Sequence, residues 1–95
     1  MKKLKDGWVE GSVQDFLSLS DADMEYIETR RSLSRRLREE RLRKHLTQTE
    51  LAVALKTSQS RVAKMEQGDP TVSLDLLIQA LFRIGMKRKD LAHAV

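Results

Sequence analysis

The stretch from Leu46 to Gly68, LTQTELAVALKTSQSRVAKMEQG, constrains the fold most strongly, because two short helical patterns follow each other across a brief polar break. The first pattern begins at Thr47, and Glu50 stands three residues later. This spacing is the capping box, in which the hydroxyl and the carboxylate satisfy free amides of a first helical turn. Apolar residues then recur at helical spacing, at Leu51, Ala52 and Leu55. A helix of about two turns is predicted.

The second pattern begins after the polar residues 56–58. Ser58 is a good N-cap, and Gly68 is the residue type that most often ends a helix in the left-handed conformation. The predicted second helix therefore runs from Gln59 to about Gln67. Its interior has only two large apolar residues, Val62 and Met65, and polar residues occupy the opposite side at Ser60, Lys64 and Gln67.

A short helix with one narrow apolar stripe and a polar, basic outer face is typical of the second helix of a helix-turn-helix. Such a helix enters the major groove of DNA, where glutamine and lysine side chains form hydrogen bonds with base edges. The spacing therefore predicts a DNA-reading motif over residues 47–68.

The motif resembles the helix-turn-helix of the Cro/C1 repressor class, also called the XRE class. The matching residues are Leu46-Thr47-Gln48, Glu50-Leu51-Ala52, Ser58-Gln59-Ser60, Val62 and Met65-Glu66-Gln67-Gly68. The resemblance implies an all-α, five-helix, lambda-repressor-like DNA-binding domain. It also implies a homodimer on a palindromic operator in double-stranded DNA.

The resemblance further assigns individual residues. It implies base contacts from Gln59, Ser60 and Lys64, and phosphate contacts from Gln48, Arg61, Lys56 and Arg43. It implies a structural salt bridge between Arg41 and Glu66. One departure is Asp69-Pro70, which stands where many members of the class have basic residues, so we expect affinity to depend more on dimerisation.

The rest of the chain reads as helix on either side of the motif. Residues 1–20 are expected to form an arm with a short helix over 13–17, and residues 21–95 to form the DNA-binding domain. Ser20 and Asp23 resemble a capping box at the start of a long helix that reaches Lys44 or His45, either unbroken with a projecting N-terminal half or kinked near residues 29–34. His45 is assigned a capping role at its end.

Two further helices are expected after the motif. Ser73 caps a helix from Leu74 to Ile84, and a terminal helix lies around residues 90–93. The strongest apolar face of the chain belongs to the first of these, at Leu74, Leu77, Ile78, Leu81 and Phe82. The predicted core comprises Leu37, Leu42, Leu51, Leu55, Val62, Met65 and Leu77.

Charge is distributed unevenly along the 95 residues. Residues 1–28 hold three lysines against seven acidic residues, a net charge of −4, whereas residues 29–46 hold eight basic residues against two acidic ones, a net charge of +6. This asymmetry suggests two partners of opposite charge. The alternative for the basic stretch is a charged helix that only keeps itself solvated.

The composition indicates no enzyme. The chain has no cysteine, its two histidines are far apart at His45 and His93, and it has no glycine cluster for phosphate. We therefore expect no catalytic residue, no metal and no cofactor. No apolar run approaches the roughly 20 residues of a membrane helix, and no secretory signal is evident. A cytoplasmic protein is expected.

The acidic arm, the long helix and the string SQSRVAKMEQGDPTVSLDLLIQAL together resemble the HigA-like antitoxin branch of the class. That resemblance implies autorepression and neutralisation of a small basic RelE/ParE-type toxin, with Trp8, Phe16 and Leu17 as candidate partner-binding residues. Trp8 has a second interpretation, as cover for the edge of the core. A stand-alone repressor and a protein-bridging module are the alternative functions.

Candidate dimer interfaces are the terminal helix with Leu91 and the long helix with Met24 and Ile27.

Overall fold

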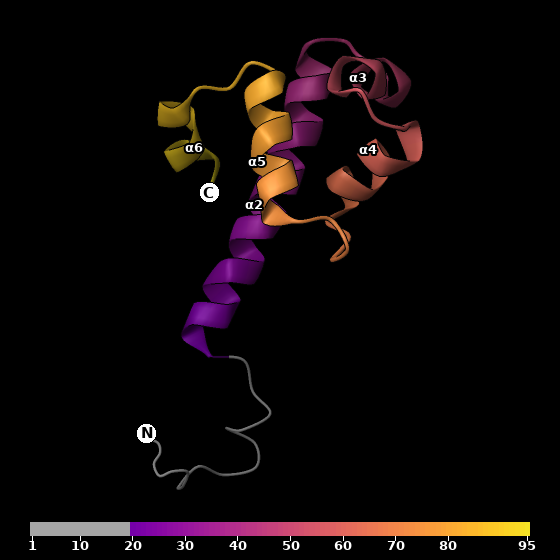
Figure 1. The fold of residues 1–95 in the computed structure, drawn as a ribbon. Helices are drawn as coiled ribbons and strands as arrows, with labels where there is room; N and C mark the ends of the chain where they lie inside the picture. Colours follow the sequence, from indigo (N-terminus) through magenta and orange to yellow (C-terminus); the bar gives the residue numbers. More distant parts are fainter. Residues whose placement is uncertain (1–19) are drawn as a thin grey trace, which may run out of the picture.

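The computed structural model describes residues 20–95, and these form five helices and no strand (Figure 1). The helices are α2 (Asp21–Arg43), α3 (Gln48–Leu55), α4 (Gln59–Gln67), α5 (Leu74–Arg83) and α6 (Arg88–Ala94). The all-α prediction is confirmed for this part of the chain. The arm, the short helix over 13–17 and the candidate partner residues Trp8, Phe16 and Leu17 lie outside the described residues.

Helix α2 is a single unbroken helix of 23 residues, as the first of the two alternatives predicted. Its start is the predicted capping box, in which the Asp23 amide donates to Ser20 Oγ at 3.1 Å and the Ser20 amide donates to Asp23 Oδ2 at 3.3 Å. The first buried side chain on α2 is Leu33, so the first turns project beyond the packed domain (Figure 1).

The core lies between α2, α3, α4 and α5, where α2 packs on α4 and α5 and α3 packs on α4, and six of the seven predicted core residues are buried there. Leu42 is the exception, because 47% of it is exposed. Each residue of an α-helix is rotated by about 100° from the one before it. Arg41 faces the core, and Leu42, one residue farther around the helix, therefore lies on the solvent side of α2.

Helix α5 also has one exposed residue on its predicted apolar face. Leu77 and Leu81 are fully buried as expected, but Phe82 is 41% exposed because it lies one step around the helix from Leu81. The terminal helix α6 is longer than predicted, at Arg88–Ala94, and none of its residues is fully buried.

The end of α2 is closed by a residue in the left-handed conformation. His45 has a φ of 59°, and the His45 amide donates to the Leu42 carbonyl at 3.0 Å. The capping role predicted for His45 is thereby confirmed. Because a Cβ atom is strained in this conformation, glycine is the better residue at such a helix end.

We expect His45→Gly to raise the free energy of unfolding by about 0.5–1 kcal/mol, since relief of the left-handed strain exceeds the added entropy of an unfolded glycine. Urea denaturation followed by circular dichroism measures this change. His45→Ala is the matched control, because alanine keeps a Cβ at the same φ and should give no gain. An equal gain from alanine would show that loss of the imidazole, and not relief of strain, is responsible.

Candidate nucleic-acid interface

The helix-turn-helix is built by local capping at both of its helices. Glu50 and Thr47 form the predicted capping box, with the Glu50 amide 3.0 Å from Thr47 Oγ1 and the Thr47 amide 2.8 Å from Glu50 Oε1. Ser58 Oγ accepts the Arg61 amide at 3.2 Å and caps α4. Gly68 ends α4 at a φ of 75°. The bounds of both helices are as the sequence predicts.

Helix α4 divides into a buried stripe and an exposed face. Val62 and Met65 are at most 1% exposed and attach α4 to the core. The outer residues are solvent-exposed and comprise Gln59, Ser60, Lys64 and Gln67. The three side chains expected to contact bases are therefore accessible on one helix, and their contact with DNA stays a prediction.

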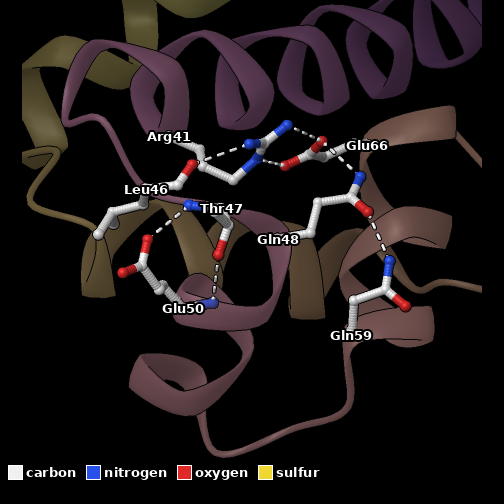
Figure 2. A network of polar contacts seen from close by, with 7 residues as sticks. All are labelled: Arg41, Leu46, Thr47, Gln48, Glu50, Gln59 and Glu66. Atoms are coloured by element: carbon white, nitrogen blue, oxygen red, sulfur yellow. Dashed lines mark hydrogen bonds and ion pairs between the residues drawn. The ribbon is translucent and has the colours of Figure 1, made fainter.

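A buried ion pair joins α2 to α4 (Figure 2). Arg41 Nε lies 2.6 Å from Glu66 Oε2, and Arg41 Nη2 donates to Glu66 Oε1 at 3.0 Å. The two side chains are only 10% and 3% exposed. Arg41 Nη1 also donates to the carbonyl of Leu46 at 2.9 Å, so it holds the chain just before α3. The hydrogen bonds to Glu66 raise the pKa of Arg41. This is the salt bridge that the resemblance implied.

Glu66 extends this network through Gln48 to Gln59 on the exposed face of α4 (Figure 2). Gln48 Nε2 donates to Glu66 Oε1 at 3.1 Å, and Gln59 Nε2 donates to Gln48 Oε1 at 2.6 Å. Because a carboxylate only accepts hydrogen bonds, Glu66 fixes which end of the Gln48 amide faces it. The oxygen of Gln48 then fixes the amide of Gln59 in the same way.

We call the hydrogen bonds from Gln59 through Gln48 to Glu66 the relay. Among the described residues, the relay leaves Gln59 Oε1 and the second hydrogen of Gln59 Nε2 without a hydrogen bond. An amide that offers one acceptor and one donor matches the N6 and N7 edge of adenine in the major groove. Sequence reasoning missed this arrangement and assigned Gln48 only to a phosphate. The second hydrogen of Gln48 Nε2 is still unassigned, so the phosphate contact stays a prediction.

The three basic residues expected to contact phosphate have different surroundings. Arg61 and Lys56 are exposed, on the first turn of α4 and at the end of α3, where Lys56 has a φ of 59°. Arg43 is 70% exposed, but its guanidinium is bound to Glu40, which also accepts Arg36 Nε at 2.9 Å. Arg43 therefore starts from an existing ion pair, which a phosphate would have to displace or share.

Glu40 is an unexpected charged residue in the core, at 4% exposure. Burial on its own raises the pKa of this carboxyl, but the hydrogen bonds and charges of Arg43 and Arg36 outweigh burial and hold the pKa below its ordinary value. Glu40 therefore stays ionised and anchors two arginines on α2.

The acidic loop after α4 is attached to α2 by Arg30, which sequence reasoning did not single out. Arg30 Nη2 donates to the carbonyls of Asp69 and Val72. The Asp69 carboxylate accepts the amide and hydroxyl of Thr71 at 2.8 and 2.6 Å, and these bonds lower its pKa. The loop is thus a fixed turn with a negative charge beside the end of α4.

Comparison with known proteins identifies the class to which this fold and motif belong. The family described as a helix-turn-helix domain matches residues 32–94, which extend from α2 through α6 and include the whole motif. The chain therefore belongs to this helix-turn-helix family, of the Cro/C1 (XRE) type, and the match supports a DNA-binding regulator of transcription. No curated protein and no solved structure matches the chain. Within residues 20–95, none of the helices combines the length and the apolar character needed to cross a membrane.

Proposed function

We propose that this regulator is the antitoxin of a type II toxin–antitoxin operon. As a homodimer it binds a palindromic operator and represses its own promoter, and it neutralises a small basic toxin of the RelE/ParE type. Each protomer inserts α4 into the major groove, with half-sites about 34 Å apart.

The observation that carries the DNA-binding part is the oriented amide of Gln59 beside the exposed Ser60 and Lys64. Gln59 donates to Gln48, which in turn donates to Glu66, so the free donor and acceptor of Gln59 are oriented before DNA binds. Preorganised contacts lose less entropy on binding than mobile ones. Base recognition by α4 is therefore centred on Gln59. Lys64, five residues farther along the helix, is a second hydrogen-bond donor.

Lys64→Ala and Arg61→Ala should affect DNA binding in different ways. Loss of Lys64 is expected to relax base preference at one operator position by about 1–3 kcal/mol, because lysine donates to guanine edges. Loss of Arg61 should lower affinity about equally for all sequences and should reduce the salt dependence, because a phosphate contact carries no base information. Titration against a panel of operator variants at several salt concentrations measures both. If Lys64→Ala leaves base preference intact, the proposed docking of α4 is wrong.

The antitoxin part is supported by the charge of the projecting end of α2. Residues 21–28 include four acidic side chains and no basic one, and all four acidic side chains are exposed. Met24 and Tyr26 lie among them at 44% and 51% exposure. An acidic surface with exposed apolar side chains suits a basic protein partner, because complementary charge accelerates encounter and apolar contact retains the complex.

Coexpression with the small basic proteins encoded by neighbouring genes tests this part. If one of them arrests growth, wild-type chain should relieve the arrest and purify with it at near-equal stoichiometry. Glu25→Lys should weaken that complex, whereas Glu39→Lys, the same charge reversal at another exposed position farther along α2, should not. Relief that both variants retain would mean that the acidic end is not the contact.

A stand-alone repressor is the alternative when no neighbouring product binds. The chain would then still bind its own upstream DNA with steep salt dependence. DNA binding that is absent at every salt concentration would instead leave a protein-bridging module.

A further inference from the structure

One exposed stripe runs along the length of α2. It is formed by positions 21, 24, 28, 31, 35, 38 and 42, whose alternate spacings of three and four residues keep them on one side of a helix. All of these positions are exposed. The charged members fall into two blocks, with Asp21 and Glu28 on the projecting end of α2 and Arg31, Arg35 and Arg38 beside the packed domain (Figure 1). We call these seven positions the α2 stripe.

We propose that two copies of the chain dimerise through the α2 stripe. The two α2 helices lie antiparallel, with Glu28 of each copy beside Arg31 of the other. The inference rests on the homodimer of the proposed function and names the surface that forms it. It does not depend on a toxin.

The charge pattern selects this direction and this register. In a two-fold symmetric pair, a contact between two positions occurs twice, once from each copy. With Glu28 beside Arg31 of the second copy, Asp21 lies beside Arg38 of the second copy, so each acidic block faces a basic one. A parallel pair would place like blocks together, and an antiparallel pair centred on residue 33 would place Arg31 beside Arg35. Opposed like charges disfavour both alternatives.

The centre of the pair is a network of four charges. Within one copy, Arg31 Nη1 lies 3.4 Å from Glu28 Oε2, and the two side chains are 68% and 56% exposed. An isolated exposed ion pair contributes little to stability, but several charges in a network contribute more. At the two-fold axis each Glu28 lies between two arginines. Next to this network, Met24, which is 44% exposed, packs on the aliphatic part of Arg35 of the second copy.

This pairing also places α4 suitably for DNA in both copies. Arg41, which is bound to Glu66 of α4, precedes Leu42 of the α2 stripe by one residue and therefore points about 100° away from the stripe. Helix α4 thus lies about a quarter turn around α2 from the interface. The two-fold axis is perpendicular to both α2 helices, so it brings the two α4 helices to the same side of the pair.

The register sets the distance between the two α4 helices. Arg41 is between eleven and twelve residues from the centre of the pair, so the two copies of Arg41 are about 35 Å apart along the helices at 1.5 Å per residue. Half-sites in the major groove are about 34 Å apart. The interface therefore gives a spacing that fits adjacent half-sites of a palindrome.

An exchange of charge between two variants provides the test. Glu28→Arg and Arg31→Glu each place like charges opposite one another at both contacts, so each variant alone should be monomeric under low-salt conditions in which the wild type is dimeric. In an equal mixture, the new arginine of one variant faces the new glutamate of the other, and native Glu28 faces native Arg31. The mixture should therefore form a heterodimer. Analytical ultracentrifugation measures the mass, and circular dichroism verifies that each variant is folded.

Two controls accompany this exchange. Lys89→Glu, a similar charge reversal at an exposed position of α6, should leave the wild-type dimer intact. Raising the salt concentration should weaken the wild-type dimer at least several-fold, because the contacts are exposed ion pairs. A wild type that is monomeric at every concentration, single variants that stay dimeric, or a mixture that stays monomeric would each overturn the proposal.

Operator binding is measured separately, so that failure of the interface and failure of the proposed function are distinguishable. A wild type that binds its operator while both single variants remain dimeric has its dimer interface on another face, and only the α2 pairing is then wrong. A wild type that shows the charge exchange but binds no DNA supports the interface and contradicts the regulator.

Discussion

Replacing Glu66 with alanine is expected to lower the free energy of unfolding by about 3–5 kcal/mol, because the guanidinium of Arg41 would be left buried without its carboxylate. Both side chains are almost fully buried, and two hydrogen bonds of 2.6 and 3.0 Å join them. The free energy of unfolding of small domains is about 5–15 kcal/mol, so this loss would be a large share of the stability of the domain. Urea denaturation followed by circular dichroism gives the value.

Two variants show whether burial of an unpaired charge is the cause. Glu39→Ala removes an exposed glutamate of α2 and should change the stability by no more than about 0.5 kcal/mol. Replacing both members of the pair, as Arg41→Met with Glu66→Leu, should recover most of the loss because no buried charge is left. If Glu66→Ala is as mild as Glu39→Ala, the ion pair does not hold α2 to α4.

Gln48→Ala is expected to reduce sequence discrimination although Gln48 is not assigned to any base. Without Gln48 the amide of Gln59 loses its acceptor at 2.6 Å and can rotate, so its preference for one base should fall by about 1–3 kcal/mol, or roughly 5- to 150-fold. A residue that only contacted phosphate would instead weaken binding equally for every sequence. Affinities for operators changed at one base pair at a time distinguish the two outcomes.

A double-mutant cycle gives this prediction its control. After Gln59→Ala, a further Gln48→Ala change should have little additional effect on base preference, because the two side chains act as one unit. Thr49→Ala, at the neighbouring exposed position of α3, should leave the preference unchanged. Additive losses from Gln48 and Gln59 would contradict the relay.

Local sequence signals were sufficient to predict the helices of the domain. Thr47, Ser58 and Ser73 each accept the predicted amide three residues later, and Gly68 ends α4 in the left-handed conformation. Capping depends on residues within one turn, so the sequence alone contains the required information. The misplaced Leu42 differs, because its burial depends on which side of α2 the other helices occupy.

The relay through Gln48 could not be predicted for the same reason. It joins residues that are 11 and 18 positions apart, and it forms because α3 packs against α4 and brings Gln48 between Gln59 and Glu66. The resemblance supplied the ion pair of Arg41 and Glu66, but no local pattern indicates that its carboxylate also orients, through Gln48, the amide of Gln59.

The shared carboxylate has an evolutionary consequence. Because Glu66 both pairs with Arg41 and accepts a hydrogen bond from Gln48, a change of Glu66 alone should lower stability and, on the proposed docking of α4, base recognition together. No hydrogen bond attaches the Lys64 side chain to the rest of residues 20–95, and the Ser60 hydroxyl contacts only Ser58. On the proposed docking of α4, divergence of operator sequence among descendants should therefore accumulate at the bases opposite Ser60 and Lys64, while the base opposite Gln59 stays ancestral.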